Sequence, residues 1–407
     1  MAGVRRVRTD AASRPARLVA RLGLRAPAPA RDEAGHRHAS WLELFFDVIF
    51  VFALAAVVNR LGTGPVPPPR DVLIVCGLFV VVQWAWVGQV FYDTRYDPDD
   101  IPHRLMVLVA LAGAGAVTLG VGETPDSVLL PIGYLIIRGV LLLLYLRVRP
   151  AGGAAREVTD VYLTGFGLGW LIWLGSLAVP AATRPVLWTV AMCVELATPW
   201  LGLRRLRRSP VDIRHLPERL GQFSIIVLGS TVANLLGAVP NRPEPRTILA
   251  AAVAFVVPAS VWWIYTTFVT TGLAVNRLRG GQAYTYLQGP MSAALLLLGW
   301  SLGEVVRLTV HGAETVPPAL RLMLGASIVI WMLGGLGLNL LAVGRPDARR
   351  LVISGYGVGS ISLIALAASR PLPLLVLVSV ALTLYAALVT RRLTAQRAGA
   401  ARQPAAE

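Results

Sequence analysis

The chain has 407 residues, of which 55% are hydrophobic and only 15% are charged, and its mean hydropathy is +0.63. This composition excludes a soluble globular domain, because long apolar stretches recur from residue 42 to residue 390, as in an integral membrane protein. The formal net charge of +16 comes with arginine as the basic residue throughout, since the chain has no lysine. Because the arginines lie between apolar stretches, we expect contact with anionic lipid headgroups and no nucleic-acid partner.

Residues 1–40 form a segment of their own. They are rich in arginine and proline and contain no apolar core before Trp41. A cleavable signal peptide needs such a core, so none is predicted, and a transit peptide is the less favoured alternative. We expect a disordered cytosolic tail that helps to orient the first helix.

About twelve membrane-spanning helices follow, since a helix needs roughly 20 mostly apolar residues to cross the hydrocarbon core. The predicted spans are 42–61, 72–92, 104–122, 127–148, 161–179, 184–203, 217–239, 247–270, 286–307, 319–343, 351–369 and 371–390. A basic linker, 204–216, divides them into one unit at 41–203 and another at 217–390, and 391–407 forms a second tail. The fold class is therefore an all-α polytopic membrane protein.

The distribution of arginine predicts the orientation of these spans. Most arginines fall in the two tails and in the loops on the same side as the tails. Loops that stay in the cytosol carry an excess of basic residues, so both termini are predicted to be cytosolic. We expect a multi-pass protein of the plasma (inner) membrane with an even number of spans.

The two units share a pattern that indicates an internal repeat. The matched pairs are Glu43 with Glu218, Asp47 with Gln222, Asn59 with Asn234, Trp86 with Trp263 and Glu123 with Glu304. The spacing between partners grows slowly along the chain, as short loop insertions would produce. Six spans in each unit give both units the same orientation, so we predict two parallel six-helix repeats related by an axis along the membrane normal.

Acidic and amide residues open the first span of each unit. Glu43 and Asp47 lie one helical turn apart and share a face, and Glu218 and Gln222 hold the matched positions. Together they could form an acidic vestibule that attracts cations. Alternatively, the acids pair with Arg219 or with arginines of nearby loops and fix the packing of the helices.

Charges also fall deeper in the apolar stretches. Arg138 lies near the middle of one span and Glu195 near the middle of another. Charges at such depth face the interior and find partners, so the simplest hypothesis is that they pair with each other. The alternative is that Arg138 meets Asp47 or Glu43, which leaves Glu195 free to bind a proton or cation. At the far end of its helix, Glu304 precedes Arg307 by three residues, which favours a local ion pair.

Little in the chain points to catalysis, a metal or a cofactor. The histidines lack metal-ligand spacing, and no nucleophile–base pair is visible. The acidic loop with Asp93, Asp97, Asp99 and Asp100 beside His103 could bind a divalent cation, although a solvated loop is the favoured interpretation. Cys76 and Cys193 lie inside apolar stretches, which excludes a disulfide framework.

Glycine and proline also mark the helices. Clusters at 165–169, 334–337 and 355–359 predict close helix packing. Pro199, Pro258 and Gly289-Pro290 can break helical hydrogen bonding, and broken helices often frame binding sites in transporters.

Three ordered blocks resemble the bacterial low temperature requirement A (LtrA) family. They are Glu43-Leu44-Phe45-Phe46-Asp47, the stretch from His215 to Gly229, and Tyr284 to Pro290 leading to Gly303-Glu304. The resemblance covers about residues 38–390 and implies a polytopic membrane protein associated with growth at low temperature. Ser230 and Gln288 depart from the acid and histidine that the family resemblance leads us to expect there, which weakens a proton-handling role for both.

These features give a leading function hypothesis, which is movement of a small solute or ion across the plasma membrane. Charges within the membrane, broken helices and a parallel repeat motivate it. A second hypothesis is a non-transporting role in cold adaptation, such as sensing the lipid phase or scaffolding a partner. A third is an intramembrane enzyme that acts on a lipid, which would need a polar cluster open sideways to the bilayer.

Overall fold

The computed structural model describes residues 41–64, 66–96, 100–208, 215–270, 281–343 and 348–402. These residues form thirteen α-helices and no β-strand, so the predicted all-α membrane fold is confirmed. The predicted tail at 1–40, residues 209–214 of the linker and residues 403–407 of the second tail lie outside the described residues.

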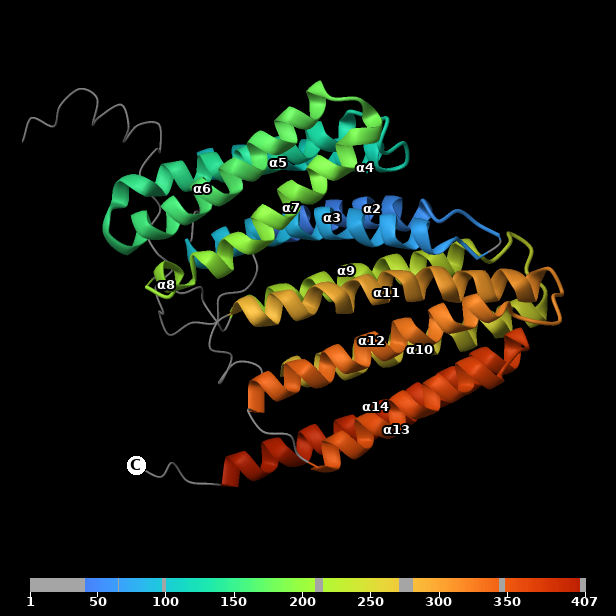
Figure 1. The fold of residues 1–407 in the computed structure, drawn as a ribbon. Coiled ribbons are helices and arrows are strands. Elements are labelled where there is room, and N and C mark those ends of the chain that lie inside the picture. Colours follow the sequence, from blue (N-terminus) through green and yellow to red (C-terminus); the bar gives the residue numbers. More distant parts are fainter. Residues whose placement is uncertain are drawn as a thin grey trace, which may run out of the picture.

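The long helices lie side by side in one bundle (Figure 1). The first half contains α2 (Trp41–Asn59), α3 (Pro69–Arg95), α4 (Ile101–Val121), α5 (Leu129–Val148), α6 (Gly153–Gly175) and α7 (Arg184–Leu201), followed by the short α8 (Leu203–Leu206). The second half contains α9 (His215–Gly237), α10 (Pro245–Thr270), α11 (Gly281–Val310), α12 (Pro318–Val343), α13 (Ala348–Ala367) and α14 (Pro371–Arg402).

Eleven of the described helices are long and apolar enough to cross a membrane, one fewer than the twelve predicted spans. The exception is α7, which corresponds to the predicted span at 184–203. Its 18 residues include Arg184, Glu195 and Pro199, and the two charged residues lower its mean hydropathy. Because α7 packs along α6 and carries a buried charge, it belongs to the bundle. The chain is thus a multi-pass membrane protein.

The order of neighbouring helices recurs in the two halves. In the first half α2 packs on α3 and α4, and α4–α5, α5–α6 and α6–α7 follow as packed pairs. In the second half α9 packs on α10 and α11, and α11–α12, α12–α13 and α13–α14 follow. This order is what a parallel repeat would give, although the repeat itself stays a prediction. The halves differ in that α3 also packs on α9 and α11 of the other half, whereas α10 packs on α14.

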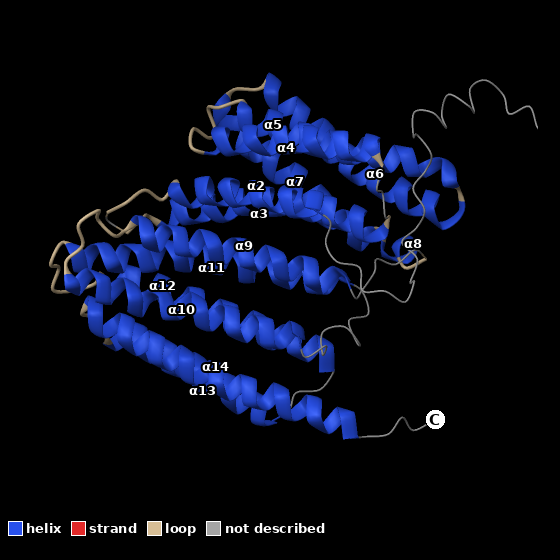
Figure 2. Cartoon of the chain, turned by 180° about the vertical axis from the view of Figure 1, so that it is seen from behind, coloured by secondary structure: helices blue, strands red, loops and turns tan. Residues whose placement is uncertain are grey.

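The two ends of the bundle carry different elements. Figure 2 shows α8, the turn between α5 and α6, and the last turns of α14 at one end. We call this the basic end, because α8 and the end of α14 are rich in arginine. We call the other end, where α2 leads into α3 and α11 into α12, the opposite end.

Arginines at the opposite end bind carbonyl oxygens at the ends of neighbouring helices. Arg60 donates to the carbonyls of Val121, Gly122 and Thr124, over 2.6–3.1 Å. Arg184 donates to the carbonyls of Pro125 and Asp126, Arg307 to that of Gly237, and Arg321 to that of Leu366. Carbonyls at a helix C-terminus have no partner within the helix, so these contacts satisfy them.

Small residues let the helices approach one another, as the glycine clusters predicted. A Cβ atom added to Gly165 would lie 2.0 Å from Oγ1 of Thr198, and one added to Gly357 would lie 2.3 Å from Cε of Met332. A side chain at either position would therefore push the neighbouring helix away.

Candidate functional site

A buried ion pair joins the two halves between α2 and α9. Nη1 of Arg219 donates to Oδ2 of Asp47 at 2.8 Å and to Oε1 of Gln222 at 2.8 Å. Asp47 and Arg219 are both buried. Of the two sequence interpretations of Asp47, the geometry favours the one in which it pairs with Arg219 and fixes helix packing.

Trp86 brings α3 into the same contact. Its indole Nε1 donates to Oδ1 of Asp47 at 2.7 Å, and its ring lies 4.5 Å from that of Phe223 on α9. The Arg219 guanidinium lies 5.8 Å from the Trp86 ring centroid, within range of a cation–π interaction. No sequence pattern predicted this role of Trp86, which was singled out only by its place in the predicted repeat.

The acids that precede this pair are engaged as well. Glu43 is buried one turn before Asp47, and Glu218 is half-buried at the start of α9. Each has a polar contact of its own. The four residues predicted for a vestibule therefore gather where α2 meets α9, but the structure neutralises Asp47 with Arg219.

A second ion pair is sealed inside the first half. Nη2 of Arg138 on α5 lies 2.6 Å from Oε2 of Glu195 on α7, and neither side chain has any exposed surface. Tyr134 bridges them, since its hydroxyl donates to Glu195 at 2.7 Å and accepts from Arg138 at 2.7 Å. The hypothesis that these residues pair with each other is confirmed, and the alternative that Arg138 meets Asp47 or Glu43 is wrong.

Glycines on two neighbouring helices make room for this pair. A Cβ atom at Gly88 of α3 would lie 2.3 Å from Nη1 of Arg138, and one at Gly169 of α6 would lie 2.6 Å from Cγ of Glu195. The ring of Phe166 lies 4.6 Å from the guanidinium carbon. The pair therefore sits among apolar and aromatic groups, where removal of one partner would leave a buried charge.

At the opposite end, Glu304 connects α11 to the segment after α2. Oε1 of Glu304 accepts from Nε of Arg307 at 2.8 Å, which confirms the predicted local ion pair. Its Oε2 accepts from the amide of Gly64 at 3.3 Å, and one turn earlier Trp300 donates to the carbonyl of Gly62 at 2.8 Å. The second half thus holds a loop of the first.

Two acids of the predicted acidic loop, Asp93 and Asp100, make polar contacts with neighbouring residues. Oδ1 of Asp93 lies 3.1 Å from Nε2 of His103, and Asp100 caps α4 and accepts from Arg147 at 2.9 Å. Partial burial raises the pKa of the Asp100 carboxyl, but the hydrogen bonds from Arg147 and the His103 amide outweigh burial and hold this pKa below its ordinary value. Asp97 and Asp99 lie outside the described residues, among which no group of histidine, cysteine and acidic residues is placed to hold a metal.

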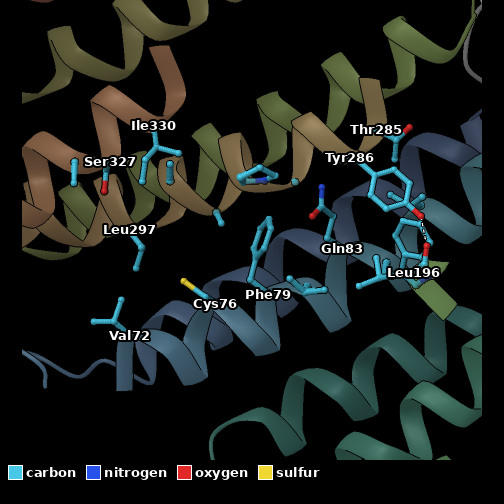
Figure 3. A pocket seen from close by; sticks show the side chains of 18 of the residues that line it. Val72, Cys76, Phe79, Gln83, Leu196, Thr285, Tyr286, Leu297, Ser327 and Ile330 are labelled. Carbon is cyan, nitrogen blue, oxygen red and sulfur yellow. Dashed lines mark hydrogen bonds between the residues drawn. The ribbon is translucent and has the colours of Figure 1, made fainter. Parts of the chain in front are cut away.

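A cavity of about 530 Å³ lies at the boundary between the halves. Figure 3 shows its wall, with Val72, Cys76, Phe79 and Gln83 on α3 facing Leu297 on α11. Apolar side chains dominate the lining.

Uncharged polar groups in the cavity lining belong to Gln83, Thr285 and Ser327, and to Trp84 and Tyr286. Oε1 of Gln83 would lie 3.2 Å from a Cβ atom at Gly289, so this amide approaches α11 where Pro290 interrupts the helical hydrogen bonds. Gln83 was not predicted as a site residue, and its signal in the sequence is an amide within an apolar stretch.

Contacts between α7 and α11 border this cavity toward the basic end. Gln282 donates to the carbonyl of Pro199 at 3.0 Å, and the hydroxyl of Tyr286 donates to the carbonyl of Leu196. The prolines at 199 and 290, which the sequence singled out as helix breaks, therefore lie on helices that meet at the cavity.

The predicted site residues do not meet in one place. Asp47 and Gln222 share Arg219, Arg138 and Glu195 form a separate pair, and Glu304 lies at the opposite end. None of these described residues lines the cavity between the halves.

Comparisons with known proteins bear on this arrangement. The family model described as bacterial low temperature requirement A protein (LtrA) matches residues 38–389. An uncharacterized protein of Rhizobium meliloti, RA0937, is 26% identical over 250 residues, which cover 58% of this chain and 60% of the relative. The match thus spans less than two thirds of that relative's length, and its name gives no activity.

Proposed function

The chain belongs to the family of bacterial low temperature requirement A proteins, and we propose that it moves a small neutral solute across the plasma membrane through the space between its halves. The basic end faces the cytosol in this proposal, because arginine is concentrated in the segments at that end.

The observation that carries the proposal is the cavity at the boundary of the halves. Transporters built from two repeats place their substrate site where the repeats meet, often beside broken helices. Here α3 and α7 of the first half face α11 and α12 of the second around about 530 Å³, which is within the range of small-molecule pockets.

The lining supports a neutral solute over an ion. The polar groups of Gln83, Thr285 and Ser327 can exchange hydrogen bonds with a solute, but none of them carries a charge. The buried charges lie elsewhere and are paired, so an ion in this cavity would have no described counter-ion to offset its desolvation.

Polar contacts at the two ends offer a means of opening. Asp47 and Arg219 join the halves on one side of the boundary, while Trp300 and Glu304 hold the loop at Gly62 and Gly64 at the opposite end. Breaking one set while keeping the other would let the halves rock and expose the cavity to one side at a time.

The two cysteines offer a test with a built-in control. Cys76 lines the cavity, and Cys193 is exposed on α7 away from it. With the protein in liposomes, swelling in glycerol or urea gradients should exceed that of empty liposomes, and a membrane-permeant methanethiosulfonate should inhibit it. Cys76→Ser should remove the inhibition and Cys193→Ser should not. Swelling no faster than in empty liposomes, or inhibition that survives Cys76→Ser, would refute the proposal.

A non-transporting role in cold adaptation is the second candidate, because the Arg138–Glu195 pair is sealed from water. This role predicts that a deletion strain carrying Cys76→Trp, which fills the cavity, still grows in the cold like one carrying the wild-type gene. Loss of cold growth in that strain, with normal protein levels, would count against this second role.

A further inference from the structure

A second groove runs along the outside of the second half, between α10 and α14. Its volume is about 660 Å³, and it is separate from the cavity between the halves. Phe255, Val256 and Ala259 of α10 and Ala386 and Ala387 of α14 give it apolar walls. Phe255 and Ala387 are exposed, so the groove opens toward the surroundings of the bundle, which in a membrane are lipid.

The polarity of the groove changes along its length. Trp263, Thr390 and Arg391 line it toward the basic end, where Nε1 of Trp263 donates to the hydroxyl of Thr390 at 3.1 Å. The helix from Phe255 to Trp263 rises by roughly 12 Å. This is close to the thickness of one leaflet's hydrocarbon, about 15 Å. Tryptophan and arginine are typical of the headgroup level. The groove therefore has an apolar part and a basic end, which match the acyl chain and the headgroup of one phospholipid.

At the basic end of the second half, two arginines have no described ion pair. Arg391 is exposed and has no described ion pair. Arg350 on α13 is 5% exposed, and its Nε and Nη1 have no hydrogen-bond partner. In the first half, Arg208 pairs with Glu157 at 2.5 Å and Arg149 with Asp160 at 2.7 Å, while Arg204 is exposed without a described ion pair.

We propose that the α10–α14 groove binds one anionic phospholipid from the leaflet at the basic end. An acyl chain lies along Phe255, Ala259 and Ala387, and the phosphate accepts hydrogen bonds from the guanidinium of Arg391. The exposed Trp263 ring covers the glycerol region. A free phosphate would use only the basic end of the groove, whereas a phospholipid uses its full length.

Titration of the intact protein in detergent, followed by native mass spectrometry, tests the site. Phosphatidylglycerol and phosphatidylcholine with identical acyl chains serve as probes. The wild type should bind the anionic lipid more tightly, and Arg391→Gln should reduce this preference about fivefold, as expected for one arginine at a membrane surface. The matched control is Arg204→Gln, which removes an exposed arginine at the basic end of the first half and should leave the preference unchanged.

A second variant tests the apolar part of the groove. Ala387→Phe fills the space between the walls without changing charge, so it should weaken binding of both lipids by a similar factor. Equal affinity of the wild type for the two lipids, or equal loss in Arg204→Gln and Arg391→Gln, would overturn the proposal. So would competition by glycerol 3-phosphate as strong as that of the lipid, or unchanged lipid binding in Ala387→Phe.

Discussion

Trp86 and Trp263 hold matched positions in the predicted repeat, yet their surroundings differ. Trp86 is fully buried at the boundary of the halves and donates to a carboxylate, whereas Trp263 is 53% exposed and donates to a hydroxyl. The difference follows from the helices that carry them, since α3 packs between the halves and α10 packs on α14 at the edge. The same residue type thus serves as an interior contact in one half and as an exposed residue in the other.

The charges of the halves differ in a related way. In the first half, Arg138 is buried against Glu195, and two surface arginines, Arg208 and Arg149, pair with Glu157 and Asp160. In the described part of the second half, Arg350 is buried without a carboxylate partner. The most deeply buried charge of the first half is thus paired, whereas a buried arginine of the second half has no described carboxylate partner.

The largest expected effect comes from breaking the sealed pair of the first half. Arg138→Met leaves the Glu195 carboxylate buried without its counter-ion, so we expect a loss of about 3–5 kcal/mol in unfolding free energy. Unfolding in detergent–SDS mixtures measures it. The double variant Arg138→Met with Glu195→Leu should recover most of that loss. A single variant as stable as the wild type would show that the pair contributes nothing to the fold.

A smaller effect separates the two tryptophans. Trp86→Phe removes a hydrogen bond to a buried carboxylate, at a cost of about 2 kcal/mol, since bonds to charged groups contribute roughly 1.5–3 kcal/mol. Trp263→Phe removes only an exposed bond and should change the unfolding free energy by less than about 0.5 kcal/mol. Equal losses in the same SDS assay would mean that the two environments are energetically alike.

The smallest effect depends on pH and concerns Asp100 at the basic end. Because its folded pKa lies below the ordinary 3.8, its ion pair with Arg147 stabilises the fold above that value. This contribution disappears as pH falls through the folded pKa. Asp100→Asn keeps the helix cap but loses the charge, so it should lower the unfolding free energy by about 1 kcal/mol at pH 7.

The pH series supplies the control for Asp100. The difference between Asp100→Asn and the wild type should shrink as pH falls below about 4, where the carboxyl of the unfolded chain becomes protonated, and vanish below the folded pKa. A difference that stays constant from pH 7 to pH 3 would assign the effect to helix capping or packing instead of charge.

Sequence reasoning reached the helices and the sealed pair for a clear physical reason. Apolar stretches of membrane length are visible locally in the sequence, and so are charges within them. A charge in such a stretch needs a partner, and the simplest prediction paired Arg138 with Glu195. At α7, which packs in the bundle with the other long helices, Arg184 and Glu195 lower the mean hydropathy, so composition alone does not identify this helix as a span.

The rest depended on packing that no local pattern contains. Gln83 is one amide in an apolar helix, and its place at the cavity follows from how α3 meets α11. Trp86 likewise reaches Asp47 because α2 and α3 pack together beside α9. Spacing could not decide which acids lie together: the structure gathers Glu43 and Asp47 near α9 and places Glu195 and Glu304 elsewhere.

The contacts of Arg60 at the opposite end depend on the shape of its side chain as well as on its charge. One guanidinium reaches three carbonyl oxygens around the end of α4, and its flat, forked shape lets two nitrogens act at once. A lysine has one nitrogen and could not span the same acceptors. Replacing arginines of this chain with lysines, for labelling or crosslinking, would therefore keep the net charge but lose hydrogen bonds that connect the ends of neighbouring helices.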